Sequence, residues 1–330
     1  MNNGWKSILL GLVISAISLV VIFFIADLGE SLQAFRQADP RYLLTALGLS
    51  LLWLVVRGYN WRALLLEQAP WREVFLTVNE GYLLNNLLPF RLGEIGRALL
   101  LSRKTILSFW QVLSSILVER ILDLAFAGGI FLSTLPFVVS APWAREAATG
   151  SVLLVVLGLG GLFLLARNQE FVERILAGLR SRWTIVDRID PRRVEAFFLG
   201  LAVLQDGKRF LYSVAWMALN WLIAVVQYYV LLQAFFPGAR LLWACFALGA
   251  AALGLAAPSS PGGIGVVELA IVGALSIFGL NPSSALAFAL TTHLLNYLTT
   301  TFIGAYALTR DGESIVSLYR RAREVREQQP

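Results

Sequence analysis

The chain of 330 residues is 58% hydrophobic and 15% charged, against roughly 45–50% and about 25% in soluble globular domains. Its net charge of +6 and isoelectric point near 9.7 would suit a nucleic-acid-binding protein, but the cations lie between apolar runs, where membrane topology explains them. The composition therefore excludes an ordinary soluble enzyme and argues against a nucleic-acid partner, and the single cysteine, Cys245, rules out an intrachain disulfide.

Crossing the hydrocarbon core takes about 20 mostly apolar residues. We expect full spans at residues 7–26, 41–57, 109–139, 151–167, 210–236 and 284–308. The first run is too long for a signal peptide and lacks a cleavage site, so it is interpreted as a retained span. Arg57, Trp61 and Arg62 close the second run in a pattern typical of the membrane interface. The link 57–74 holds Arg57, Arg62 and Arg72, which favours the cytoplasmic side.

Two shorter apolar runs are interrupted by proline and glycine. The run 74–88 leads into Asn85–Arg97, N-N-L-L-P-F-R-L-G-E-I-G-R, and the run 241–257 leads into Ala257–Glu268, A-P-S-S-P-G-G-I-G-V-V-E. Pro89 breaks or kinks any helix there, because proline lacks an N–H group. Broken, polar-tipped segments in both halves of a membrane chain indicate a transporter-like binding site. We expect two re-entrant hairpins, with pairs of kinked full spans as the alternative.

The fold predicted is an all-α polytopic membrane protein with about six full spans and two re-entrant broken-helix hairpins in an inverted repeat. Residues 1–330 form a single transmembrane domain, with repeat halves at about 41–139 and 210–308. The link 168–208 is amphipathic and cationic, and the tail 310–330 is charged. With the N-terminus inside, every arginine-rich link and the C-terminus fall on the cytoplasmic face of the cell inner membrane. The first hairpin then opens from the cytoplasm and the second from the outer side.

Ionisable groups inside a membrane are costly and usually functional. Arg91, Glu94 and Arg97 follow the first break, spaced so that Glu94 can meet either arginine. The two guanidinium groups, beside glycines that expose backbone N–H groups, suit a phosphate clamp. The alternative is a buried ion network that locks the hairpin shut.

A second charged group lies in the span 109–139. Glu119 and Asp123 are four residues apart and share a helix face. Arg120 either balances them or pairs with Glu94. Counter-ion support is the expected role of this group, with direct ligand contact as the alternative.

The second hairpin carries Glu268, which has no cation nearby in the sequence. It either meets an arginine across the repeat interface or is protonated, and in that state it would carry a proton through the cycle. His293 is interpreted first as an inter-helix hydrogen-bonding residue, with a functional role as the alternative. The other candidates for contact with a substrate lie at the two breaks: Asn86, Pro261, Gly262 and Gly263.

Three polar residues precede the break at Pro89: Glu80, Asn85 and Asn86. They suit two roles equally well, which are hydrogen bonds to the free backbone groups of the broken helix and contact with a ligand. One histidine and one cysteine cannot form a zinc site, and neither a Walker loop nor a nucleophile elbow is present. We therefore expect no metal and no cofactor.

Three motifs together resemble a known family. They are N-x-x-x-P-x-R-x-G-E-x-x-R at Asn85–Arg97, E-R-x-x-D at Glu119–Asp123, and P-G-G-I-G-x-x-E at Pro261–Glu268. Over roughly residues 7–310 the chain is similar to the lysylphosphatidylglycerol synthase transmembrane region, also called the flippase-like or YbhN-type integral membrane family. The resemblance implies a lipid-handling membrane domain, with Arg91, Glu94, Arg97, Glu119, Arg120, Asp123 and Glu268 at the motif positions. The synthases' aminoacyltransferase domain has no counterpart here, so their synthase activity is not expected.

The sequence thus favours a flippase that moves an anionic phospholipid or lipid-linked substrate, with Arg91 and Arg97 holding the head group between the hairpins. Transport would be passive or ion-coupled, and the protein would not be an enzyme. One alternative is an intramembrane enzyme acting on a lipid phosphate or polyprenyl carrier, with Glu119 and Asp123 as acid–base groups. Another is a non-transporting partner of an envelope-lipid enzyme, docked on the cationic 168–208 surface.

Overall fold

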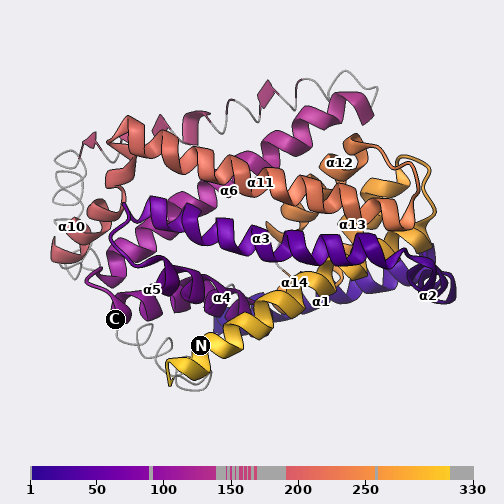
Figure 1. The fold of residues 1–330 in the computed structure, drawn as a ribbon, viewed down its shortest axis with the longest axis horizontal. Coiled ribbons are helices and arrows are strands. Elements are labelled where there is room, and N and C mark those ends of the chain that lie inside the picture. Colours follow the sequence, from indigo (N-terminus) through magenta and orange to yellow (C-terminus); the bar gives the residue numbers. More distant parts are fainter. Residues whose placement is uncertain are drawn as a thin grey trace.

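The computed structural model describes residues 2–88, 92–138, 191–256 and 259–312, with side chains from residue 9 and scattered positions between 146 and 168. In these ranges the chain is helical and contains no strand. Figure 1 shows the long helices lying side by side along one axis, as expected for a membrane bundle. The predicted all-α class is confirmed for the described residues.

The first span ends in a sharp bend. α1 (Asn2–Ile25) is followed by α2 (Leu28–Gln37), turned by 79° from it. Asp27 starts α2, because its carboxylate accepts the backbone N–H of Glu30 at 2.8 Å and so satisfies a free donor of the first turn. Residues 27–40, which lie between the first two expected spans, therefore contain a helix.

Three of the described helices are long and apolar enough to cross a membrane: α3 (Pro40–Leu64), α6 (Phe109–Val138) and α11 (Gly207–Phe235). The bent pair α1–α2 makes a fourth if it counts as one span. α14 (Pro282–Arg310) is equally long, but the polar run at Thr291–Thr301 makes it less apolar. The six-span count and the inverted repeat remain predictions.

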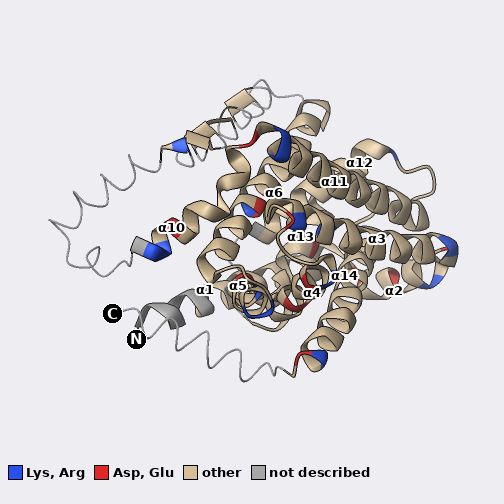
Figure 2. Ribbon diagram, turned by 60° about the vertical axis from the view of Figure 1, so that its left-hand side comes forward, with Lys and Arg blue, Asp and Glu red and all other residues tan. Residues whose placement is uncertain are grey.

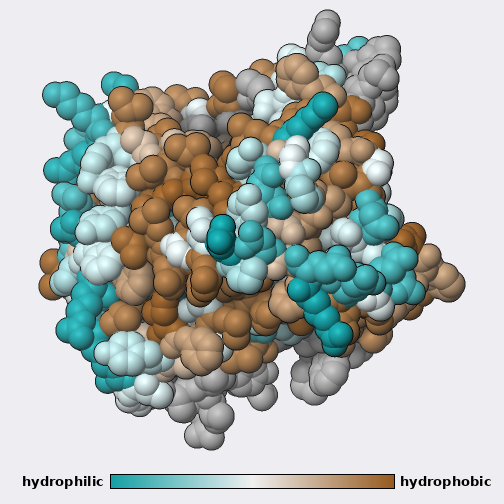
Figure 3. Space-filling model, turned by 45° about the vertical axis from the view of Figure 1, so that its right-hand side comes forward, coloured by the Kyte–Doolittle hydropathy of each residue, from teal (hydrophilic) through white to brown (hydrophobic). Residues whose placement is uncertain are grey.

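The surface agrees with a membrane location. In Figure 3 apolar side chains form a broad area, with hydrophilic residues along its left edge and in a patch at the right. Many large apolar residues of the long helices are exposed, such as Leu44, Leu222 and Phe302. In Figure 2 most charged positions lie near helix ends, and a few lie among the helices.

The first predicted hairpin is present as two short antiparallel helices, α4 (Trp71–Leu87) and α5 (Leu92–Lys104). Their backbones touch at two glycines: a Cβ atom on Gly93 would lie 2.0 Å from the carbonyl oxygen of Gly81. The Asn85 side chain accepts the backbone N–H of Gly93 at 2.9 Å, as expected for a residue that satisfies a helix break. Pro89, Phe90 and Arg91 lie outside the described residues.

The second hairpin consists of α12 (Leu241–Ala256), the short 3₁₀ turn η3 (Pro261–Gly263) and α13 (Val266–Ser276). The turn requires glycine, because Gly262 and Gly265 have φ angles of 70° and 88°, which other residues rarely adopt.

The two hairpins enter the bundle from opposite ends. The base of the first lies where α14 finishes: Lys104 of α5 forms an ion pair with Asp311, and Glu73 of α4 binds Arg310 at 2.9 Å. The base of the second lies where α14 starts, since α13 ends shortly before Pro282. In Figure 1 α4 and α5 accordingly lie to the left and α12 and α13 to the right. Both hairpin tips therefore point toward the middle of the bundle.

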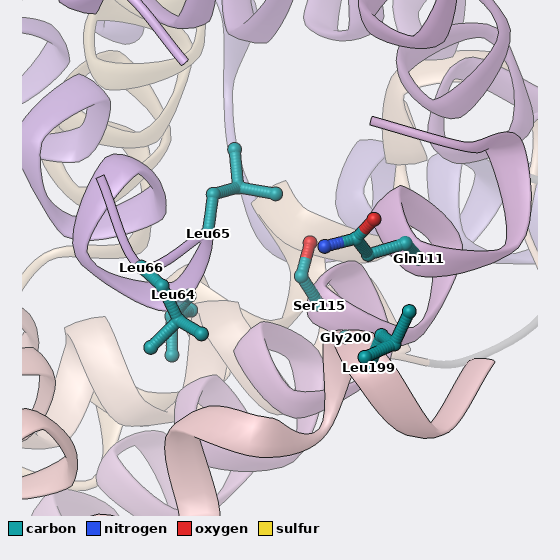
Figure 4. A pocket seen from close by; sticks show the side chains of 7 residues that line it. All are labelled: Leu64, Leu65, Leu66, Gln111, Ser115, Leu199 and Gly200. Atoms are coloured by element: carbon teal, nitrogen blue, oxygen red, sulfur yellow. The ribbon is translucent and has the colours of Figure 1, made fainter. Parts of the chain in front are cut away.

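The described part of the cationic link contains α10 (Pro191–Gly200) and η2 (Ala202–Leu204); residues 169–190 lie outside the description. α10 packs so closely on α6 that a Cβ atom on Gly200 would lie 2.2 Å from the carbonyl oxygen of Gln111, so only glycine fits at this position. Figure 4 shows Gln111 and Ser115 of α6 facing Leu199 and Gly200 in this seam. The seam is a packing contact with no space for a ligand.

Candidate functional site

Six charged residues from three helices meet inside the bundle, and we call them the ionic cluster. They are Arg57 of α3, Glu94 and Arg97 of α5, and Glu119, Arg120 and Asp123 of α6. The structure thus brings together five residues that the sequence motifs predicted, and adds Arg57.

Glu119 is the centre of the cluster. Its side chain is fully buried and accepts hydrogen bonds from Arg97 Nη1 and Nη2 at 3.1 and 2.8 Å and from Arg120 Nη2 at 2.5 Å. Arg57 Nη2 also donates to it. A carboxylate with this many charged donors acts as a counter-ion that holds α3, α5 and α6 together. These contacts favour the counter-ion role over the acid–base role.

Arg57 corrects the sequence interpretation. Its position near Trp61 and Arg62 suggested a residue at the membrane interface, yet Arg57 is buried and donates to Asp123 at 2.8 and 2.5 Å. The same side chain lies 3.4 Å from the amide oxygen of Asn220 on α11. An arginine inside a 25-residue helix was the available signal, because a cation so far from the helix ends needs a buried partner.

The contacts of Arg97 agree with the second interpretation of this residue, a buried ion network that locks the hairpin shut. It is buried, both its terminal nitrogens bind Glu119, and its guanidinium carbon lies 4.0 Å from the centre of the Trp61 ring. It can bind a phosphate only if Glu119 is released. Arg91, its expected partner in the clamp, lies outside the described residues.

One edge of the cluster is accessible. The side chains of Arg120, Glu94 and Asp123 are 28%, 24% and 18% exposed. Glu94 pairs with Arg120 at 3.7 Å, which is longer than the 2.5 and 3.1 Å contacts of Arg120 with Glu119 and Asp123. Arg120 was expected either to balance Glu119 and Asp123 or to pair with Glu94, and it contacts all three. Its pair with Glu94 is the longest and therefore the weakest of these contacts.

The tip of the second hairpin carries a second polar group, which we call the hairpin-tip cluster: Gly262, Glu268, His293 and Tyr297. Glu268 accepts the backbone N–H of Gly265 at 2.7 Å, and its other oxygen contacts His293 Nδ1. No arginine pairs with it among the described residues, so the arginine alternative stays a prediction, whereas the inter-helix hydrogen bond expected of His293 is confirmed.

His293 contacts the second hairpin through both ring nitrogens. Nε2 is 3.1 Å from the carbonyl oxygen of Gly262, and Nδ1 faces the Glu268 carboxyl group. Because a carbonyl oxygen only accepts, the contact with Gly262 suits the tautomer that has a proton on Nε2. His293 thus links α14 to the turn and to the first residues of α13.

α14 connects the two hairpin tips. Asn86 Nδ2 at the first tip donates to Thr300 Oγ1 at 3.1 Å, and Tyr297 Oη donates to the carbonyl of Pro261 at the second tip at 3.5 Å. Asn86, Pro261 and Gly262 therefore reach a common helix. Gly263 is buried at the second tip. Tyr297 and Thr300 were not predicted from the sequence, although the polar run in α14 was a visible signal.

A third group lies at the base of the first hairpin. Lys104 Nζ binds buried Glu80 at 2.9 Å and also pairs with Asp311 beyond α14. Glu80 thus fixes α5 against α4. In the part of the chain that is described, no three His, Cys, Asp or Glu side chains are arranged to hold a metal ion.

A family model described as the lysylphosphatidylglycerol synthase TM region matches residues 8–304 of the chain. The protein belongs to this family. Three relatives show its range. A UPF0104 membrane protein of Methanothermobacter thermautotrophicus is 24% identical over 325 residues, covering 92% of this chain and 95% of its own. Another, of Methanocaldococcus jannaschii, is 24% identical over 320 residues, covering 90% and 93%.

The third relative is the glycosyltransferase AglD of Haloferax volcanii, 25% identical over 364 residues. The match covers 98% of this chain but 57% of AglD. No solved structure matches this chain significantly. Family membership makes this a membrane protein, in agreement with the three long apolar helices among the described residues.

Proposed function

We propose that this member of the lysylphosphatidylglycerol synthase transmembrane family moves an anionic phospholipid or lipid-linked substrate between the leaflets of the cell inner membrane. The observation that carries the proposal is the meeting of two hairpin tips, from opposite ends of the bundle, on the polar middle of α14. Polar groups at such depth are expensive and are kept where a substrate passes.

The accessible edge of the ionic cluster is the proposed first contact for an anionic head group. The three arginines and three carboxylates of the cluster balance each other, so an anion must replace a carboxylate to bind. Glu94 is the one to be replaced, because it is partly exposed and holds Arg120 at 3.7 Å, the longest ion pair there. Arg120 then offers a planar guanidinium to a phosphate group.

The Glu268–His293 pair is the proposed coupling site. The pair lies beside the turn Pro261–Gly263, and binding or release of a proton there would change the contact between the second hairpin and α14. The start of α1 and the end of α14 lie at the same end of the bundle (Figure 1), which supports the proposal that both termini are cytoplasmic.

A leaflet-exchange assay in proteoliposomes tests the function. Fluorescent phosphatidylglycerol is placed in both leaflets, and quenching from outside measures transfer. We expect the native protein to speed exchange, Arg91→Ala to abolish it while the protein stays folded, and Glu94→Gln to increase affinity for the anionic lipid. The matched control is Glu67→Gln, because Glu67 is exposed and pairs with Arg62 at the bundle end. Lack of exchange with the native protein, over a panel that includes lipid-linked sugars, contradicts the proposal.

The similarity to AglD favours a second candidate, a non-transporting membrane partner in lipid-linked sugar metabolism. AglD is named a glycosyltransferase, and this chain matches about half of it. In that case substitutions in the ionic cluster leave lipid transfer unchanged, and arginines on the cationic link surface, such as Arg193, become the sensitive positions.

A further inference from the structure

The middle of α14 contains an asparagine that none of the described contacts explains. Asn296 is the central residue of the helix Pro282–Arg310, and its side chain is exposed. The amide makes no hydrogen bond to any residue that the structure describes. An amide that faces hydrocarbon at the bilayer centre would be strongly unfavourable, so this exposure needs a polar neighbour.

Helical geometry shows where Asn296 faces. His293 lies three residues before it and Thr300 four residues after it, so the three share one face. His293 contacts the tip of the second hairpin, and Thr300 contacts the tip of the first through Asn86. The bilayer-facing row of α14 lies on a different face and is apolar: Leu290, Leu294, Leu298 and Phe302. Asn296 therefore faces the space between the two hairpin tips.

Apart from the Glu268–His293 pair at the second tip, the groups described around this space are neutral. They are the amides of Asn86 and Asn296, the Tyr297 hydroxyl and backbone carbonyls of the turn Pro261–Gly263. The ionic cluster, in contrast, consists of charged side chains, and its three arginines and three carboxylates neutralise each other. An amide both donates and accepts hydrogen bonds, which suits a hydroxyl group better than a bare phosphate, because a phosphate offers mainly acceptors.

We propose that Asn296 binds a hydroxyl of the lipid head group at the midpoint of its path, so that the preferred substrates carry glycerol or sugar hydroxyls beyond the phosphate. This assignment rests on the proposed lipid-moving function and names its substrate class. Arg120 meets the phosphate, whereas Asn296 distinguishes hydroxyl-bearing head groups from others.

The first test asks whether the site is wet. In a Cys245→Ser background, Asn296→Cys is treated with a charged thiol reagent that does not enter hydrocarbon, and Leu298→Cys serves as the bilayer-facing control. We expect reaction at position 296 and none at 298. Equal resistance of both positions would overturn the proposal, because Asn296 would then face lipid.

The second test measures binding without transport. Thermal unfolding in detergent is followed with phosphatidylglycerol, phosphatidic acid or soluble glycerol phosphate added to native protein, Asn296→Leu and Thr299→Val. Thr299 is the matched control, because its hydroxyl already bonds to the Leu295 carbonyl of its own helix. We expect Asn296→Leu to bind phosphatidylglycerol about threefold to tenfold more weakly, as for one lost hydrogen bond, and to bind phosphatidic acid like the native protein.

The outcomes separate this inference from the proposed function. Equal weakening of both lipids, or none, overturns the role of Asn296. Equal stabilisation by soluble glycerol phosphate overturns a lipid as the source of the hydroxyl. Selective binding without leaflet exchange supports the site and contradicts transport.

Discussion

The ionic cluster makes a quantitative prediction for Glu119→Gln. The native side chain is fully buried and meets three guanidinium groups, so the substitution leaves three arginines facing only Glu94 and Asp123. Removing one partner from a buried ion pair typically costs about 3–5 kcal/mol, because the remaining charge stays buried without compensation. Glutamine keeps one acceptor oxygen but turns an NH₂ group toward arginine donors. We therefore expect a loss of about 3–5 kcal/mol in the free energy of unfolding.

The measurement is denaturant unfolding in mixed micelles, followed by tryptophan fluorescence. Glu67→Gln is the control, since its exposed ion pair with Arg62 should contribute only about 0.2–1 kcal/mol. Glu119→Gln combined with Arg97→Gln restores the charge balance, and we expect the double variant to regain about 1–3 kcal/mol relative to additivity. A loss below about 1 kcal/mol for Glu119→Gln, or strictly additive effects, would contradict the role of Glu119 as the central counter-ion.

Two further predictions concern the hairpins. Gly93→Ala should prevent stable pairing of α4 with α5, because its Cβ would lie 2.0 Å from the Gly81 carbonyl oxygen, whereas Gly129→Ala, with open space around it, should be tolerated; size-exclusion chromatography and unfolding in detergent distinguish them. Glu268→Gln removes the carboxyl group that contacts His293, so we expect lipid exchange to lose its response to a pH gradient while the protein stays folded. An unchanged response in vesicles with different internal pH would remove Glu268 from the coupling.

Much of the fold follows from local sequence. Runs of about 20 apolar residues predict spans, and proline with glycine predicts the breaks, because both act through the backbone of a few neighbouring residues. The ends of α6 and α14 accordingly lie within two residues of those predicted. The α2 helix was missed, since its start depends on a cap by Asp27 in a short polar segment.

The partners of the buried charges were decided only by the tertiary structure. Sequence spacing allowed Glu94 to pair with Arg91, Arg97 or Arg120, and among the described residues the packing of α5 against α6 gives it Arg120. Arg57 lies 62 residues from Glu119 in the chain, and no local pattern relates them. The same holds for Glu268 and His293, which are 25 residues apart.

Composition and local pattern were sufficient to predict a helical membrane protein with two broken helices and an unusual set of intramembrane charges. These properties follow from composition and from backbone rules that act within one helix. Helix packing, in contrast, gives Arg97 its partner Glu119, leaves Arg120 as the accessible arginine of the cluster, and brings both hairpins onto the polar face of α14. The physical reason is that a charge or amide in a low-dielectric interior takes whichever partner helix packing brings within hydrogen-bond distance, and packing joins residues that are distant in sequence.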